Sequence, residues 1–135
     1  MDYLGQLAPE VTRNFAAALD LGLVPLANNP FNESRFPIKF AEYMAAGTPV
    51  LCSAVGECAT FFDVFPWALP AGSEKDTWLK SFRDTMELAM AGSLPIVNHH
   101  VLAKALSWQH QANLLDGLYQ AELTASTTRA ITPTL

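Results

Sequence analysis

Short apolar runs alternate with longer amphipathic stretches along the first two thirds of the chain. The apolar runs have the length of strands and lie at residues 1–4, 21–26, 49–53 and 67–69. The amphipathic stretches have apolar residues at helical spacing and predict helices at residues 9–19, 37–46 and 74–91. Strands that alternate with helices indicate a parallel sheet with crossover helices.

Proline, glycine and serine mark the ends of these helices. Pro9 and Pro37 suit the first turn of the first two helices, because a proline there loses no helical hydrogen bond. Gly47 is typical of the residue that follows the end of a helix, and Ser73 predicts the N-cap of the third helix. Gly56 is expected to begin a turn into a short helix at residues 57–62.

The first helix is expected to have one apolar side. That side consists of Val11, Phe15, Ala18 and Leu19.

The last third of the chain is helical in pattern. We expect helices at residues 98–105 and 108–124 with a break near Ser107, and a frayed Thr-rich tail at residues 125–135. The expected fold is therefore α/β, a partial Rossmann-like parallel sheet with crossover helices and a helical C-terminal extension. It forms one domain, residues 1–124, followed by the tail.

Composition narrows the class of protein. Half of the residues are hydrophobic and 16% are charged, which excludes a disordered chain. The net charge of -5, with scattered Lys and Arg, argues against a nucleic-acid partner. No apolar run reaches the roughly 18 residues of a membrane span, and the N-terminus lacks the pattern of a secretory signal. We therefore expect no transmembrane segment and a cytoplasmic location.

Cys52 and Cys58 allow two interpretations. They could form a disulfide or half of a metal site, or they could be two small buried hydrophobic residues. A zinc site would need a second pair of ligands at defined spacing. We favour the buried pair and expect no metal.

The segment at residues 23–51 carries the candidate chemistry. A strand ends near Pro25, a polar loop follows at residues 28–35, and a helix begins at Pro37. Ligands of open parallel sheets bind beyond the carboxyl ends of the strands, and a helix N-terminus suits phosphate oxygens. Glu42 could accept hydrogen bonds from a ribose diol. Alternatively, it is a solvent-facing residue paired with Lys39, three positions earlier on the same helix face.

The run Phe-Pro-Ile-Lys-Phe-Ala-Glu-Tyr-Met-Ala-Ala-Gly-Thr-Pro-Val-Leu at residues 36–51 resembles a known signature. It is similar to the donor-site signature of the retaining, family-four glycosyltransferases with the GT-B fold, above all to the subgroup with Pro-x-Lys-x-x-Glu-Tyr-Met-Ala-x-Gly. Residues 21–26 resemble the strand before the donor loop of that family, and residues 53–56 resemble its glycine-containing turn. Ser107-Trp108, followed by a helix with Tyr119, resembles its closing helix.

The resemblance implies a set of donor-binding residues. Glu42 matches the glutamate that holds the ribose hydroxyls. The glutamate that contacts the donor sugar falls on Ser34, with Glu33 adjacent. The backbone N–H groups that bind the diphosphate fall on Phe36 and Ile38, because Pro37 has none.

Lys39, at the start of the same helix, completes the predicted set. The resemblance implies no metal or other cofactor and designates no catalytic residue.

The resemblance also implies missing parts. In the family, an Arg and a Lys from an earlier half of the domain neutralise the diphosphate, and a second domain binds the acceptor. Neither has a counterpart in this sequence. We therefore expect a piece of a larger glycosyltransferase that binds a nucleoside diphosphate sugar, is inactive alone, and needs the missing N-terminal half as its partner. Without that half, open sheet edges predict self-association.

Two alternatives from other classes stay open. The chain could be a non-catalytic α/β module that binds nucleotides or proteins. It could also be a flavodoxin-like domain that binds a different phosphate ligand.

Overall fold

The computed structural model describes residues 5–131, so the strand expected at residues 1–4 lies outside the described residues. The chain divides into two compact units between His99 and His100. The first unit contains a sheet and its covering helices, and the second unit is helical.

The elements of the first unit follow the expected order. They are α1 (Pro9–Ala17), β1 (Gly22–Val24), α2 (Pro30–Glu33), α3 (Ile38–Ala45), β2 (Val50–Ser53), the 3-10 helix η1 (Gly56–Phe61), β3 (Ala68–Ala71) and α4 (Lys75–Met90). The expected strands within the described residues and the expected helices are confirmed, with shifts of a few residues at their ends. One addition is α2, a single turn within the loop that was expected to be irregular.

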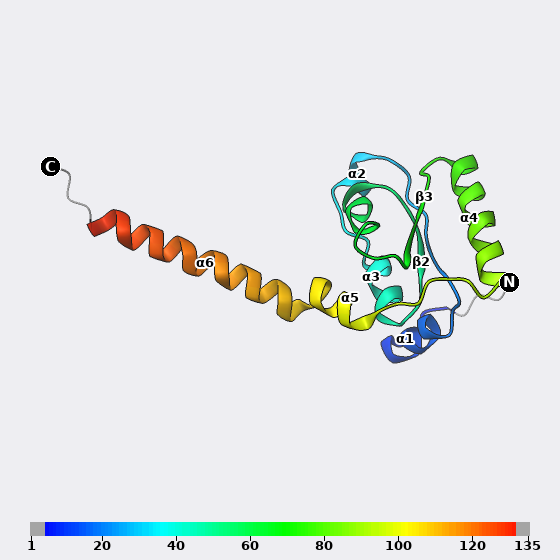
Figure 1. The fold of residues 1–135 in the computed structure, drawn as a ribbon, viewed down its shortest axis with the longest axis horizontal. Helices are drawn as coiled ribbons and strands as arrows, with labels where there is room; N and C mark the ends of the chain where they lie inside the picture. Colours follow the sequence, from blue (N-terminus) through cyan, green and yellow to red (C-terminus); the bar gives the residue numbers. More distant parts are fainter. Residues whose placement is uncertain (1–4, 132–135) are drawn as a thin grey trace. The chain divides into compact units, whose positions relative to one another are not determined.

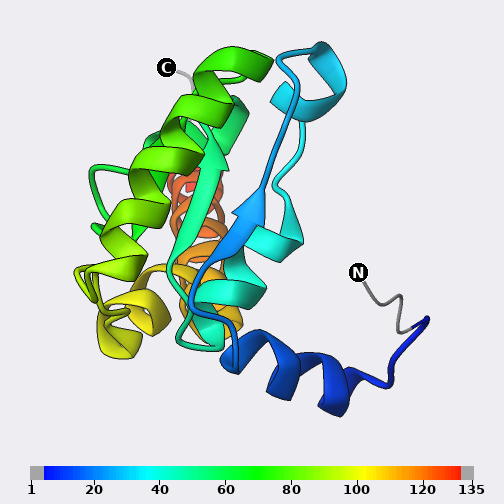
Figure 2. The same cartoon turned by 90° about the vertical axis from the view of Figure 1, so that its right-hand side faces the viewer.

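The described strands form a parallel three-stranded sheet in the order β1-β2-β3. Helices α3 and α4 cover opposite faces of this sheet (Figures 1 and 2). The α/β prediction, a partial Rossmann-like sheet, is therefore confirmed. Among the described strands none pairs with the outer edge of β1, and the peptide groups of Leu23 point toward that edge because those of Gly22 bond to β2.

The core lies around β2. All four residues of this strand are buried, and Phe40 and Met44 of α3 are fully buried next to it. A row of aromatic rings continues the core beyond α3. Neighbouring ring centroids lie 5.5 to 6.1 Å apart along Phe36, Phe40, Phe61, Phe65 and Trp67.

Helix α3 ends as the sequence predicts. Gly47 has φ of +92°, a left-handed conformation that glycine adopts without strain. Its N–H donates to the carbonyl of Met44, and the N–H of Thr48 donates to the carbonyl of Tyr43. These two bonds form a Schellman motif, which satisfies carbonyl groups at the end of the helix.

The N-cap predicted for the third long helix is wrong by one residue. Glu74, and not Ser73, is the N-cap of α4, and its side chain makes no capping bond. The Thr77 side chain packs against Gly72 and donates its hydroxyl to the carbonyl of Glu74. The chain therefore enters the helix one residue later than expected.

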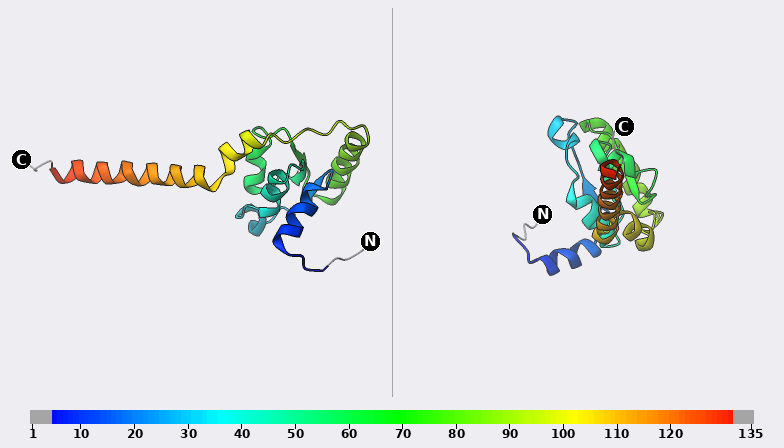
Figure 3. Two further views of the ribbon diagram at one scale, coloured as in Figure 1. Left: turned by 90° about the horizontal axis from the view of Figure 1, so that it is seen from below. Right: turned by 90° about the vertical axis from the view of Figure 1, so that its left-hand side faces the viewer.

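The second unit contains most of α5 (His99–Leu106) and all of α6 (Trp108–Ile131). The break near Ser107 is confirmed, and the hydroxyl oxygen of Ser107 accepts a hydrogen bond from the His110 N–H at 3.2 Å. Helix α6 is one continuous helix (Figure 3) that extends beyond residue 124, where we expected it to end. In the part of the chain that the structure describes, no helix is long and apolar enough to cross a membrane.

Candidate functional site

The loop that follows β1 is anchored to the end of the neighbouring strand. The N–H of Leu26 donates to the hydroxyl oxygen of Ser53 at 2.9 Å, and this serine is fully buried. The Ser53 hydroxyl lies 3.4 Å from the carbonyl oxygen of Gly72. One side chain therefore joins the carboxyl ends of all three strands, the edge where parallel sheets bind ligands.

Asn32 fixes the shape of the same loop. Its side-chain amide donates to the carbonyl of Ala27 at 2.8 Å, and its N–H donates to the side-chain oxygen of Asn29 at 2.9 Å. Asn29 is thus the N-cap of α2. Asn32 is also buried, so its hydrogen bonds tie α2 to the start of the loop away from solvent.

Gly56 lets this loop approach the turn after β2. A side-chain carbon at position 56 would lie 2.8 Å from the carbonyl oxygen of Glu33 and 3.0 Å from that of Asn32. Real side chains do not tolerate the shorter contact, and the φ of +57° also favours glycine. The contact brings together two segments of the resemblance, the donor loop and the glycine-containing turn.

Arg35 is a residue of this loop that the sequence analysis missed. Its Nε donates to Oδ1 of Asn32 at 3.1 Å, and its guanidinium lies 4.7 Å from the centre of the Phe31 ring. Asn32 and Arg35 are three residues apart, a spacing that brings two side chains together only in a helical turn. The sequence did not indicate the single turn of α2, so it did not indicate this pair.

A groove of about 430 Å³ lies at the carboxyl end of β1. It runs between the end of the strand and the start of α3, and its lining includes Leu23, Leu26, Arg35, Phe36, Ile38 and Lys39. Three predicted site residues, Phe36, Ile38 and Lys39, therefore meet in one groove.

The first residues of α3 line this groove. The N–H groups of Ile38 and Lys39 belong to the first turn of the helix, where no carbonyl of the helix can accept them. The N–H of Phe40 donates to the carbonyl of Pro37 at 2.9 Å. Phe36 packs its ring edge-on against Phe40, which fixes the backbone at this point.

Glu42 is paired with Lys39, as the alternative interpretation predicts. The Lys39 ammonium donates to Oε2 of Glu42 at 2.6 Å, and both side chains are half exposed. This hydrogen bond raises the pKa of Lys39 above its ordinary value. The role of Glu42 in ribose binding stays a prediction.

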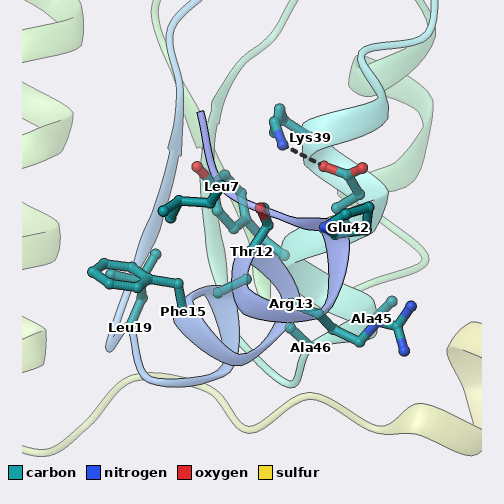
Figure 4. A pocket seen from close by; sticks show the side chains of 12 residues that line it. Leu7, Thr12, Arg13, Phe15, Leu19, Lys39, Glu42, Ala45 and Ala46 are labelled. Carbon is teal, nitrogen blue, oxygen red and sulfur yellow. Dashed lines mark hydrogen bonds and ion pairs between the residues drawn. The ribbon is translucent and has the colours of Figure 1, made fainter. Parts of the chain in front are cut away.

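A second pocket, of about 580 Å³, lies between α3 and α1, together with the segment that leads into α1 (Figure 4). Lys39 and Glu42 extend from α3, whereas Leu7 and Thr12 come from the other side. Arg13 and Phe15 of α1 complete the wall. Lys39 lines both this pocket and the groove at the end of β1.

The remaining predicted residues, Ser34 and Glu33, line neither cavity. The Ser34 hydroxyl donates to the carbonyl of Phe31 at 3.2 Å, and Glu33 is exposed to solvent. Both follow directly on Asn32 in the sequence and precede Arg35, which lines the groove. Their role in sugar binding stays a prediction.

Cys52 and Cys58 are fully buried free thiols, as the second interpretation of this pair predicts. The hydrogen bond with Cys58, together with burial, raises the pKa of Cys52. Neither thiol lines the groove or the pocket. Among the described residues, no cluster of His, Cys, Asp and Glu could hold a metal ion.

Part of the chain is similar to a known protein. No protein-family model and no solved structure matches the chain. A stretch of 49 residues, 36% of the chain, is 33% identical to a protein of Bacillus subtilis (strain 168) described as "Putative teichuronic acid biosynthesis glycosyltransferase TuaH". The match spans 12% of the length of that protein. It supports a sequence relationship between this chain and a glycosyltransferase.

Proposed function

We propose that this chain is part of the donor-binding domain of a retaining GT-B glycosyltransferase of family four, and that it binds a nucleoside diphosphate sugar. The observation that carries the proposal is the position of Lys39. Its side chain lines both the pocket that contains Glu42 and the groove at the end of β1. A ligand with a nucleoside at one end and a sugar at the other can lie across this residue.

The pocket suits the nucleoside. Leu7 and Phe15 give it apolar wall for a base, and Glu42 supplies a carboxylate for the ribose hydroxyls. Pairing with Lys39 does not prevent this role, because a carboxylate offers about four acceptor sites on its two oxygens. Glu42 can accept from Lys39 and from a ribose diol at the same time.

The start of α3 suits the diphosphate. The N–H group of Ile38 and the ammonium of Lys39 lie at the positive end of the helix. Phe36 contributes its N–H at the preceding turn. The sugar then extends toward Ser34 and Glu33, and the resemblance assigns sugar selection to that part of the loop.

We further propose that these residues bind and orient the donor without a metal. Catalysis in such a site depends on positioning and on stabilisation of the leaving diphosphate. The acceptor site and further basic contacts belong to other parts of the enzyme, so the isolated chain is inactive. Residues 1–124 form the piece of the domain, and the cytoplasm is its location.

The outer edge of β1, with which no described strand pairs, is the proposed contact with the missing half. The Leu23 peptide groups point outward, and the Leu23 side chain is 39% exposed. A parallel strand from that half would satisfy these groups. Without it, self-association is the alternative use of the same edge.

The half-exposed Glu42–Lys39 pair favours a second candidate, a non-catalytic α/β module. In that case the pair only stabilises the surface of α3, and such pairs contribute from nothing to about 1 kcal/mol.

The first prediction separates these two functions. Glu42→Ala in the 135-residue chain removes the acceptor for the ribose hydroxyls and should weaken nucleoside diphosphate binding by about 2 kcal/mol. Calorimetry with a panel of nucleoside diphosphates measures this loss. Glu87→Ala, an exposed glutamate of α4, is the matched control and should bind like the unchanged chain. Equal affinity of all three proteins would remove Glu42 from the site.

A further inference from the structure

The Arg35 guanidinium is held in place by two neighbours of different kinds. Asn32 accepts a hydrogen bond from its Nε at 3.1 Å, and Phe31 lies against its face at 4.7 Å from the ring centre. Asn32 is itself buried and bonded to the carbonyl of Ala27. The guanidinium is therefore more restricted than that of an ordinary surface arginine.

The two terminal nitrogens of Arg35 remain available as donors to a ligand. The contact with Asn32 uses the Nε–H, and the guanidinium carbon lies over the Phe31 ring, an interaction that uses no hydrogen-bond donor. Among residues 5–125, whose side chains the structure describes, no carboxylate forms a salt bridge with Arg35. The planar pair of terminal amino groups is the part of arginine that matches the oxygens of a phosphate.

Arg35 lines the same groove as Ile38 and Lys39. The groove thus combines a restricted guanidinium, an ammonium and the first N–H groups of a helix. The Lys39 ammonium is already bonded to the Glu42 carboxylate, which partly neutralises its charge. Lys39 therefore gives the groove less positive charge than an unpaired lysine would. Arg35 has no such partner among the described residues and is the cation best suited to an added anion.

We propose that Arg35 is a phosphate-binding residue of this groove, which contacts the outer phosphate of the donor through its terminal nitrogens. Asn32 and Phe31 are positioning residues that hold the guanidinium toward the groove. The identity of the ligand as a nucleoside diphosphate sugar rests on the proposed function. The affinity of Arg35 for a phosphate group does not.

The test uses inorganic pyrophosphate, which contains the phosphates but neither base nor sugar. In an NMR titration of the 135-residue chain, pyrophosphate should shift the Arg35 Nε–H signal and the backbone signals of Ile38 and Lys39. Arg35→Gln should weaken pyrophosphate binding about tenfold, because it removes a charge-assisted pair of hydrogen bonds whose strength solvent exposure reduces. Arg35→Lys keeps the charge but loses the paired donors, so its affinity for pyrophosphate should lie between those of the unchanged chain and Arg35→Gln.

Two variants complete the design. Arg83→Gln removes an exposed arginine of α4 and should leave binding unchanged. Phe31→Leu should broaden the Arg35 Nε–H signal and weaken binding about threefold, since the cation–π contact is lost but the charge is kept. Phe31 is 68% exposed, so this variant should fold normally. Circular dichroism spectra check the fold of each protein.

The outcomes separate the inference from the proposed function. If Arg35→Gln and Arg83→Gln bind pyrophosphate equally, or if the chain binds none, the inference is wrong. If Arg35→Gln weakens pyrophosphate binding while Glu42→Ala leaves every nucleoside diphosphate unaffected, the phosphate site stands and the nucleotide assignment fails. If Glu42→Ala weakens nucleotide binding while Arg35→Gln leaves pyrophosphate binding unchanged, the donor site stands without Arg35.

Discussion

Helices α1 and α3 are alike in sequence pattern but differ in what covers them. Both begin near a proline, and both have apolar residues on one side. In α3 the side chains of Phe40 and Met44 are fully buried against the sheet. In α1 only Ala16 is buried, whereas Phe15 is 50% exposed.

This difference separates what periodicity predicts from what it leaves open. The spacing of apolar residues predicts a helix and the direction of its apolar side. It does not predict which surface will cover that side. Helix α3 follows β1 and precedes β2, so the sheet covers it. Helix α1 packs against α3, and the hydroxyl of Thr48 donates to the carbonyl of Ala16 at 2.6 Å.

The largest expected effect tests the covered helix. Phe40→Ala removes a fully buried ring between α3 and the aromatic row, and it should lower the free energy of unfolding by about 3–5 kcal/mol. Phe15→Ala on α1 should cost much less, because half of its ring is already in solvent. Urea unfolding of both variants measures the comparison. Equal losses would show that the two helices are equally covered in solution.

A smaller effect tests how the two helices end. Gly47→Ala places a side chain at φ of +92° and 3.3 Å from Nε2 of His99, so it should cost about 1–2 kcal/mol of unfolding free energy. Helix α1 has no such glycine, and its C-cap Ala18 has an ordinary φ of -90°. Ala18→Gly should therefore change the free energy by less than about 1 kcal/mol. Thermal or urea unfolding gives both values. A harmless Gly47→Ala would contradict the Schellman end of α3.

The smallest effect on stability concerns the exposed side of α1. Phe15→Gln should change the free energy of unfolding by no more than about 0.5 kcal/mol, as is usual for surface positions. It should nevertheless reduce self-association, because Phe15 and Val11 of α1, with Leu19 just after the helix, expose apolar surface on the segment that leads to the β1 edge.

Light scattering at micromolar concentration compares Phe15→Gln with the unchanged chain. Met90→Gln, at an exposed position of α4, controls for general solubility. If the unchanged chain and both variants are monomeric, the proposal that the unpaired edge of β1 causes self-association is contradicted.

Regular elements were predictable where local signals and periodicity agreed. Pro37 and Gly47 mark α3 almost to the residue, and the apolar run before Ser53 gives β2. The signals failed where two neighbouring residues competed, as at Ser73 and Glu74. The end of α6 was also missed, because small residues and threonines such as Thr124 weaken a helix prediction without excluding a helix.

The candidate site was predictable in its location more than in its contacts. The rule for parallel sheets places a ligand at the carboxyl end of β1, where a groove lies. Both interpretations of Glu42 followed from its sequence, and its pairing with Lys39 is now seen while its ligand role stays a prediction. Asn32 and Arg35 were missed because their contacts depend on the single turn of α2, which has no periodicity of its own.

The close contact at Gly56 has a consequence for how such a loop can change. Any larger residue at position 56 would push on the carbonyl groups of Asn32 and Glu33 without touching a ligand. The loop would then sample several conformations, and Arg35 would lose its fixed direction. If the groove binds the proposed ligand, a substitution in the turn after β2 would therefore lower the affinity by disordering the loop, with the chemical groups of the groove unaltered. The residue at position 56 therefore affects how well ordered the neighbouring loop is, although it lies in a different segment of the chain.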